Sequence, residues 1–97
     1  MIAPISVQRV IDELVELYPI DKLVLFGSRA VGDFEERSDF DIAVFSQTLC
    51  RKKFSRLRLD AAESRTLYWV SLVHFDTNPK ALQQRILEQG ITIYERT

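Results

Sequence analysis

The sequence predicts an α/β (α+β) fold in which helices pack on a small mixed β-sheet of about three to four strands. Short runs rich in β-branched and aromatic residues, at 22–26, 40–44 and 67–75, have the lengths of buried strands. The segments between them repeat apolar residues at helical spacing, and glycine, proline or asparagine stands at several junctions. The order helix, strand, short helix, strand, helix, strand, helix therefore predicts an α/β unit of about two or three layers.

The first helix is indicated by apolar residues at helical spacing that follow Ser6, which we take as the N-cap; they are Val7, Val10, Ile11, Leu14 and Leu17. Pro19 ends this helix because proline cannot continue it. The run from Lys22 to Phe26 is short and apolar, so it is predicted to be a strand buried on both faces. Gly27 ends that strand.

After a second strand, the chain is predicted to form a helix, a third strand and a last helix. The helix is marked by apolar residues at helical spacing, Phe54, Leu57, Ala61 and Ala62. The third strand spans Leu67 to Phe75 and is rich in aromatic and β-branched residues. Asn78-Pro79 is a helix-start signal and Gly90 a helix-end signal. Ile91 to Tyr94 is predicted to be a short extended tail.

Length and composition restrict the class of protein. The 97 residues suffice for a modest core, so we expect a single domain over residues 1–97. The formal net charge of −1 gives no overall signature of nucleic-acid binding, and none is expected. One cysteine, Cys50, excludes an internal disulfide and a cysteine-rich zinc site. The sequence shows no signal peptide and no long apolar span, so we expect a cytoplasmic protein without a membrane segment.

The turn after the first strand has the residues of a phosphate site. Gly27 lets the backbone approach a ligand closely, and Ser28 could cap a short helix whose free N–H groups attract anions. The Ser28 hydroxyl beside those amides suits the β- and γ-phosphates of a nucleoside triphosphate. A purely structural turn has the same pattern, since strand-glycine-serine-helix junctions are common.

The second strand has the residues of a metal site. Phe40, Ile42 and Val44 alternate with Asp39, Asp41 and Ala43, so a strand places both aspartates on one face. Mg²⁺ prefers hard oxygen ligands, with one or two carboxylates and the rest from water and substrate phosphates. The alternative is a solvated polar strand end. The residues of a phosphate site and the pair of aspartates follow each other in this order on successive strands. Their combination favours the metal site over a solvated strand end.

Basic residues follow the two halves of this predicted site. Arg29 directly follows Ser28, and its guanidinium could chelate phosphate oxygens or point outward to pair with Glu35 or Glu36. A further basic run contains Arg51, Lys52, Lys53, Arg56 and Arg58. The run is predicted to be a solvated helix face, with contact to triphosphate, an acidic partner or RNA as the alternative.

Gly27, Ser28, Asp39 and Asp41 match the Gly-Ser-x10-Asp-x-Asp signature of the polymerase-β-like nucleotidyltransferases. The chain length and the ending from Leu82 to Tyr94 resemble the minimal nucleotidyltransferases of that superfamily. The resemblance implies the polymerase-β-like nucleotidyltransferase core. It also implies an acceptor hydroxyl that attacks the α-phosphorus of ATP, with Mg²⁺ as the cofactor.

Asp39 and Asp41 would hold two Mg²⁺ ions about 3.5–4 Å apart, the first more secure than the second. Ser28 and the amides beside Gly27 would hold the leaving pyrophosphate. The sequence departs from the family at the third carboxylate, which active members place in a segment like Val-Asp-Leu-Val. The matching segment here is Val70-Ser71-Leu72-Val73, so a serine replaces the carboxylate. His74 or Asp76 could substitute for it only if the strand ends or bends before them.

Two functions from different classes follow from this resemblance. Minimal nucleotidyltransferases commonly act as antitoxins that transfer AMP to a tyrosine of HEPN-domain ribonuclease toxins. The first hypothesis is this transfer, with a HEPN-domain protein as acceptor and a homo- or hetero-oligomer as the assembly. The second is a weak or inactive enzyme that neutralises its HEPN partner by binding, anchored by Trp69 or Tyr94, although core packing is the expected use of Trp69. Transfer to a small molecule is a third possibility, disfavoured because no second lobe could hold it.

Overall fold

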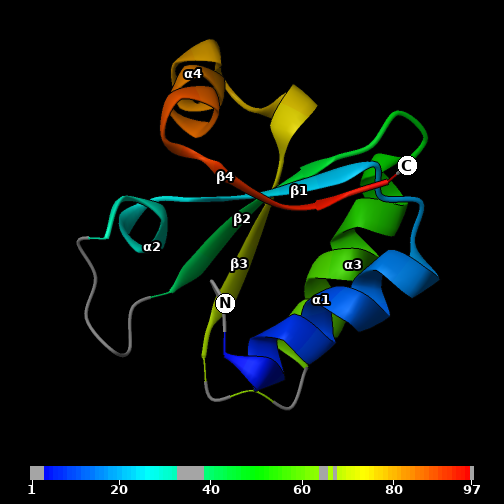
Figure 1. Ribbon diagram of the computed structural model, residues 1–97. Coiled ribbons are helices and arrows are strands. Elements are labelled where there is room, and N and C mark those ends of the chain that lie inside the picture. Colours follow the sequence, from blue (N-terminus) through cyan, green and yellow to red (C-terminus); the bar gives the residue numbers. More distant parts are fainter. Residues whose placement is uncertain (1–3, 33–38, 64–65, 67, 97) are drawn as a thin grey trace.

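The computed structural model describes residues 4–32, 39–63, 66 and 68–96, which form a four-stranded mixed sheet flanked by helices (Figure 1). The strands are β1 (Lys22–Phe26), β2 (Phe40–Phe45), β3 (Val70–His74) and β4 (Ile91–Glu95). The helices are α1 (Ile5–Leu17), α2 (Ser28–Val31), α3 (Arg51–Ala62) and α4 (Lys80–Gln89), and a 3-10 turn, η1, spans Phe75–Thr77. The predicted fold class and order of elements are confirmed.

The strand order is β3-β2-β1-β4, so β1 and β2 are the two inner strands. β1 is antiparallel to both β2 and β4, whereas β2 and β3 are parallel. A parallel pair needs a crossover connection, and α3 supplies it between β2 and β3. Ile91–Glu95, predicted to be an extended tail, is the edge strand β4 and pairs with β1.

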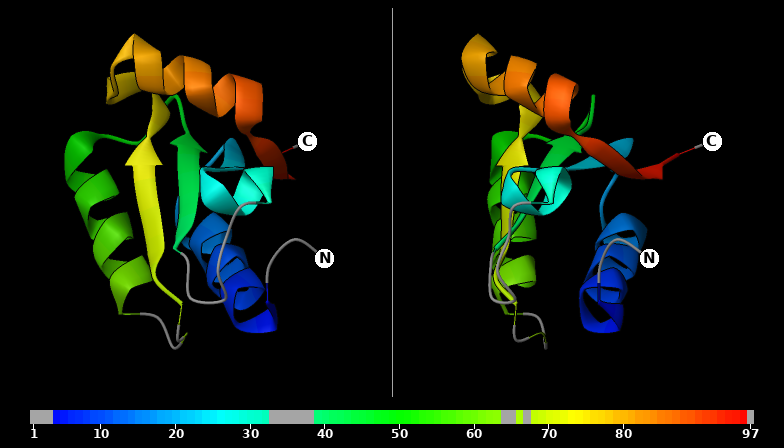
Figure 2. Two further views of the ribbon diagram at one scale, coloured as in Figure 1. Left: turned by 90° about the vertical axis from the view of Figure 1, so that its left-hand side faces the viewer. Right: turned by 60° about the vertical axis from the view of Figure 1, so that its left-hand side comes forward.

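Helices cover both faces of the sheet, α1 and α3 on one side and α4 on the other (Figures 1 and 2). Alternate side chains of the inner strands enter two separate clusters. Leu23, Leu25 and Ile42 pack with residues of α1 and α3, whereas Val24 and Ala43 pack with Ile86 of α4. Asp41 lies between Phe40 and Ile42, so it belongs to the α4 face of β2.

Three local predictions are wrong. Ser6 is not an N-cap: α1 begins at Ile5 with Pro4 in the capping position, and Ser6 Oγ lies 3.0 Å from Thr66 Oγ1. The third strand is shorter than 67–75, because η1 turns the chain at Phe75; Leu67 is outside the described residues. Asn78 does not cap α4 but donates from Nδ2 to the His74 carbonyl at 2.6 Å.

The described residues contain no helix that is both long enough and apolar enough to cross a membrane. This agrees with the amphipathic pattern of α1, whose buried residues Val7, Val10, Ile11 and Leu14 form one stripe.

Tyr18 joins the end of α1 to α3, because its hydroxyl donates to Asp60 Oδ2. This hydrogen bond, burial and the negative charge of Asp60 raise the pKa of Tyr18 above 10.0. We expect Tyr18→Phe to lower the free energy of unfolding by about 1 kcal/mol. The neutral phenol is the stabilised form, so this contribution is present below pH 10.0 and is lost as the pH rises through the raised pKa.

Denaturant unfolding of both proteins at about pH 8 and about pH 11, below and above the ordinary pKa of tyrosine, measures this difference. The stability gap between wild type and Tyr18→Phe should be smaller at the higher pH, because the tyrosine of the unfolded state is then largely ionised. A gap of the same size at both pH values would contradict the assignment of the hydrogen bond.

Candidate active site

Gly27 forms the junction between β1 and α2. Its φ of 77° and ψ of −157° lie in a region that is almost restricted to glycine. Gly27 is itself the N-cap of α2, and its carbonyl accepts hydrogen bonds from the N–H groups of Ala30 and Val31 at 3.0 and 3.2 Å. Ser28 is therefore the first helical residue, and the prediction that its side chain caps the helix is wrong.

Asp41 lies directly against this glycine. In the antiparallel pair of β1 and β2, Phe26 is the register partner of Asp41. A Cβ atom built on Gly27 would lie 2.5 Å from Asp41 Oδ2, so only glycine leaves room for the carboxylate. The two halves of the sequence signature thus meet in space through one contact between neighbouring strands.

The electrostatics of Asp41 fit a cation site. Burial raises the pKa of the Asp41 carboxyl above its usual range, and the negative charge of Asp39 raises it further. The two carboxylates are thus close enough to repel each other, and a divalent cation between them would remove that repulsion. Among the described residues, no group of three or more His, Cys, Asp or Glu side chains could hold a metal. Two carboxylates nevertheless fit Mg²⁺, which commonly takes its other ligands from water and phosphate.

Ser71 stands beside Asp41 in the sheet. The two residues are register partners in the parallel pair of β2 and β3, where adjacent strands lie about 4.7–4.9 Å apart. Partners in register share a face, so the Ser71 hydroxyl is the neighbouring polar group of β3 on the side of Asp41. The row Phe26, Asp41, Ser71 crosses three strands of the sheet.

His74 and Asp76 do not approach this row. His74 pairs with Val44, three residues beyond Asp41 and about 10 Å along the strand. Its ring makes an edge-to-face contact with Phe54 of α3, with centroids 5.2 Å apart, so it faces the opposite side of the sheet. Asp76 lies further on, in η1. Neither residue is placed to act as a third carboxylate.

Arg29 rests on aromatic rings. Its guanidinium carbon lies 4.2 Å from the ring centroid of Phe40 and 5.4 Å from that of Tyr68. The Phe40 side chain is buried and belongs to the α1 and α3 face, opposite Asp41. Glu35 and Glu36, the alternative partners, lie outside the described residues. In this arrangement the guanidinium is held at the edge of the site rather than over the carboxylates.

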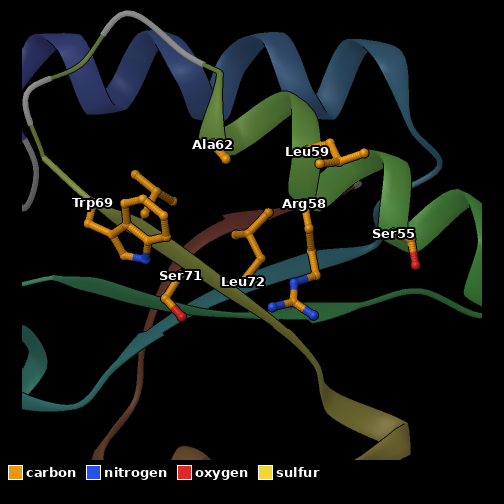
Figure 3. A pocket seen from close by; sticks show the side chains of 8 residues that line it. Ser55, Arg58, Leu59, Ala62, Trp69, Ser71 and Leu72 are labelled. Atoms are coloured by element: carbon orange, nitrogen blue, oxygen red, sulfur yellow. The ribbon is translucent and has the colours of Figure 1, made fainter.

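A groove of about 410 Å³ adjoins Ser71 between α3 and β3 (Figure 3). Arg58 and Leu59 of α3 line one side, and Trp69 lies with Ser71 on the other. Trp69 was expected in the core but is 61% exposed. Sequence reasoning missed this groove, because it depends on how α3 lies against β3; of the basic run, Arg58 is the member that lines it.

The sequence analysis also missed the contact between Gly27 and Asp41. The glycine itself was identified from its place at the end of a strand, but its steric relation to the aspartate depends on the register of β1 with β2. No pattern within either segment contains that register.

Comparison with known proteins gave matches of two kinds. A family model described as Polymerase beta, Nucleotidyltransferase matches residues 8–97. A crystal structure of a toxin–antitoxin with AMP-PNP is similar at 26% identity, with 93% of this chain and 74% of that chain covered and a TM-score of 0.74. A search of curated proteins gave no match.

Two further solved structures share the fold. The toxin–antitoxin MntA-HepT is 24% identical, with 92% of this chain and 70% of that chain covered and a TM-score of 0.66. A complex of a tri-AMPylated Shewanella oneidensis HEPN toxin with MNT antitoxin is 23% identical, with 92% and 72% covered and a TM-score of 0.63.

Proposed function

This chain belongs to the polymerase β nucleotidyltransferase family, and from that premise we propose that it is an antitoxin that transfers AMP from ATP to a HEPN-domain protein. The observation that carries the proposal is the placement of Asp41 against Gly27 and beside Asp39. The similar toxin–antitoxin with AMP-PNP supports ATP as the nucleotide, and the AMPylated HEPN toxin in a complex of the same fold supports the acceptor. The whole of residues 1–97 would form one nucleotidyltransferase domain.

Each residue of the site has a separate task. Asp39 and Asp41 would hold Mg²⁺, which when bound neutralises the charge of the triphosphate and of the leaving pyrophosphate. Gly27 allows the phosphates to approach the backbone, and Ser28 would donate its hydroxyl to them. To reach the outer phosphates, the Arg29 guanidinium would have to leave the rings of Phe40 and Tyr68 on which it rests.

The transfer joins the acceptor oxygen to the α-phosphorus and breaks the bond from that phosphorus to the pyrophosphate oxygen. The hydroxyl gives its proton to solvent water as the new bond forms, because no described residue beside Asp41 is placed as a third carboxylate. The protein contributes mainly position and charge, since it holds the triphosphate between the Gly27 turn and the two carboxylates.

One observation favours a second candidate function, neutralisation of the HEPN partner by binding alone. Ser71 occupies the register position beside Asp41, where active members of the family are expected to carry a carboxylate. A hydroxyl is a weaker metal ligand and a weaker base than a carboxylate.

Incubation with α-labelled ATP, Mg²⁺ and a co-expressed HEPN-domain protein separates the two candidates. Transfer predicts label on the HEPN protein that disappears with Asp39→Asn and with chelation of the metal. A tight complex that carries no label would contradict transfer and support neutralisation by binding alone. A HEPN protein that is neither labelled nor bound would refute both candidates.

Ser71→Asp tests the missing carboxylate directly. We expect the rate of transfer to rise by about 10²-fold, because a general base or metal ligand would return beside Asp41. A third carboxylate also adds repulsion, so the thermal midpoint of this variant should fall without Mg²⁺ and recover when it is added. Ser71→Asn is the matched control, because asparagine has the shape of aspartate without its charge. It should neither raise the rate of transfer nor make the thermal midpoint depend on Mg²⁺. An unchanged rate would show that the serine at position 71 does not limit transfer.

A further inference from the structure

The single tryptophan of the chain lies beside the candidate metal site. Val70 and Phe40 are register partners in the parallel pair of β3 and β2. Trp69 comes one position before Val70, and its neighbour on the side of β2 is therefore Asp39. The Phe40 N–H donates to the Trp69 carbonyl at 2.9 Å, which holds the backbone of Trp69 against β2. Side chains alternate along a strand, so Trp69 shares a face with Ser71, the face of the candidate site.

The indole of Trp69 is open to solvent at this place. Trp69 is 61% exposed, whereas tryptophan side chains are highly buried on average. It lines the groove together with Ser71, and Figure 3 shows the indole next to the Ser71 side chain. One exposed apolar residue is not unusual in itself. The position of this one, beside Asp39 and two residues before the partner of Asp41, indicates a part in the reaction.

The order of the strands sets the side from which the acceptor arrives. The Gly27 turn, which would hold the leaving pyrophosphate, follows β1; the two aspartates belong to β2, and Ser71 and Trp69 to the side of β3. β2 lies between the other two strands. In this kind of displacement the attacking and leaving oxygens are roughly in line through the phosphorus. Because pyrophosphate leaves toward β1, the acceptor oxygen approaches over Ser71, and the side chain that carries it passes Trp69.

The side chain of tyrosine fits this path. Ser71 and Trp69 are two residues apart, which is about 6.6–6.8 Å along a strand. Paired aromatic rings have centroids about 4.5–7 Å apart, so a phenol with its hydroxyl over Ser71 can place its ring on the indole. The hydroxyl of serine or threonine is one carbon away from the Cα atom. The backbone of such an acceptor would have to descend beside the bulky indole to reach the same point.

We propose that Trp69 binds the acceptor: its indole stacks on the ring of the tyrosine whose hydroxyl attacks the α-phosphorus, and so holds that hydroxyl over Ser71. The inference rests on the proposed function for the transfer and for the HEPN-domain acceptor. The bond from the tyrosine oxygen to phosphorus forms, the bond to pyrophosphate breaks, and the phenol proton goes to solvent water. Trp69 makes and breaks no bond, and its contact is the same before and in the transition state.

Steady-state kinetics test this contact. Trp69→Ala should raise the KM for the HEPN-domain protein about tenfold, as truncation of a well-packed interface tryptophan does. It should change kcat by less than about twofold, because a contact of equal strength in both states affects binding alone. The KM for ATP should stay that of the wild type. Trp69→Phe keeps an aromatic face and should recover most of the loss.

Leu17→Ala is the matched control. It also removes an exposed apolar side chain, 69% exposed, but Leu17 ends α1 on the opposite side of the sheet. It should change neither KM. Circular dichroism of the three variants confirms that they fold.

The fluorescence of Trp69 gives a readout that needs no turnover. The probe is a HEPN-domain protein whose own tryptophans are replaced by phenylalanine, added without ATP. The Trp69 emission should shift to shorter wavelength as the indole leaves water. Replacement of the acceptor tyrosine of the probe by phenylalanine should abolish labelling in the transfer assay but keep the shift. Replacement of the same tyrosine by serine should abolish both.

The outcomes separate this inference from the proposed function. Labelled HEPN protein with an unchanged KM in Trp69→Ala and no shift would overturn the role of Trp69 and leave the transfer intact. A shift that is lost with one tyrosine of the probe, without any label, would keep the contact and remove the transfer. A raised KM for ATP instead of the HEPN protein would assign the indole to the adenine base and overturn the proposal. A shift that survives replacement of every tyrosine by serine would also overturn it.

Discussion

Asp41→Asn is expected to lower the rate of AMP transfer by at least about 10³-fold while leaving the fold at least as stable as before. The amide keeps the shape of the carboxylate but cannot offer its charge to a metal. The stability should not fall, because burial and the charge of Asp39 both disfavour the ionised Asp41 carboxylate in the folded protein. Transfer assays and thermal unfolding on the same preparation measure the two effects.

Asp76→Asn is the control for this substitution, since Asp76 is exposed in η1 beyond the far end of β3. It should leave the transfer rate unchanged. If Asp41→Asn instead lowers the thermal midpoint sharply and spares transfer, Asp41 is a structural group and the metal assignment fails.

Gly27→Ala is expected to damage stability and transfer together. The φ of 77° with ψ of −157° costs about 1–3 kcal/mol for a residue with a Cβ atom. The new methyl group would also lie 2.5 Å from Asp41 Oδ2 and push that carboxylate out of place. Misplacement of a reacting group by about 1 Å can cost about 10²-fold in rate, and we expect a loss of that order.

Gly32→Ala separates the two causes. Gly32 also has a positive φ, of 82°, but a Cβ atom there would meet none of the described residues within 4 Å. We expect a loss of about 1 kcal/mol in the free energy of unfolding with no change in transfer rate. Equal losses of transfer in the two variants would show that backbone strain, rather than contact with Asp41, explains the effect of Gly27→Ala.

The sequence predicted elements well where a local pattern decides them. β1 is Lys22–Phe26 as predicted, because a short apolar run bounded by turns has few alternatives. Local patterns predicted the wrong N-cap where a neighbouring residue could occupy the capping position instead. Pro4 and Gly27 occupy the capping positions predicted for Ser6 and Ser28, and a serine side chain is not needed where the backbone already starts the helix.

Long-range placement was less predictable. The apolar alternation of Ile91–Glu95 does not reveal that this segment pairs with β1, on the opposite side from β2. Trp69 was expected in the core because of its size, but it lies just outside the paired region of β3 and remains exposed. The site was predictable as two motifs, and its assembly was not, because strand register joins them.

The register of β1 with β2 has a consequence for misfolding. A slip by one residue would turn every side chain of β2 to the other face of the sheet. Asp41 would then enter the apolar layer under α1 and α3, and Ile42 would take its place beside Gly27. A molecule paired in this way would lose its apolar core together with the contact between Asp41 and Gly27, so a stable isomer without the candidate site should not accumulate.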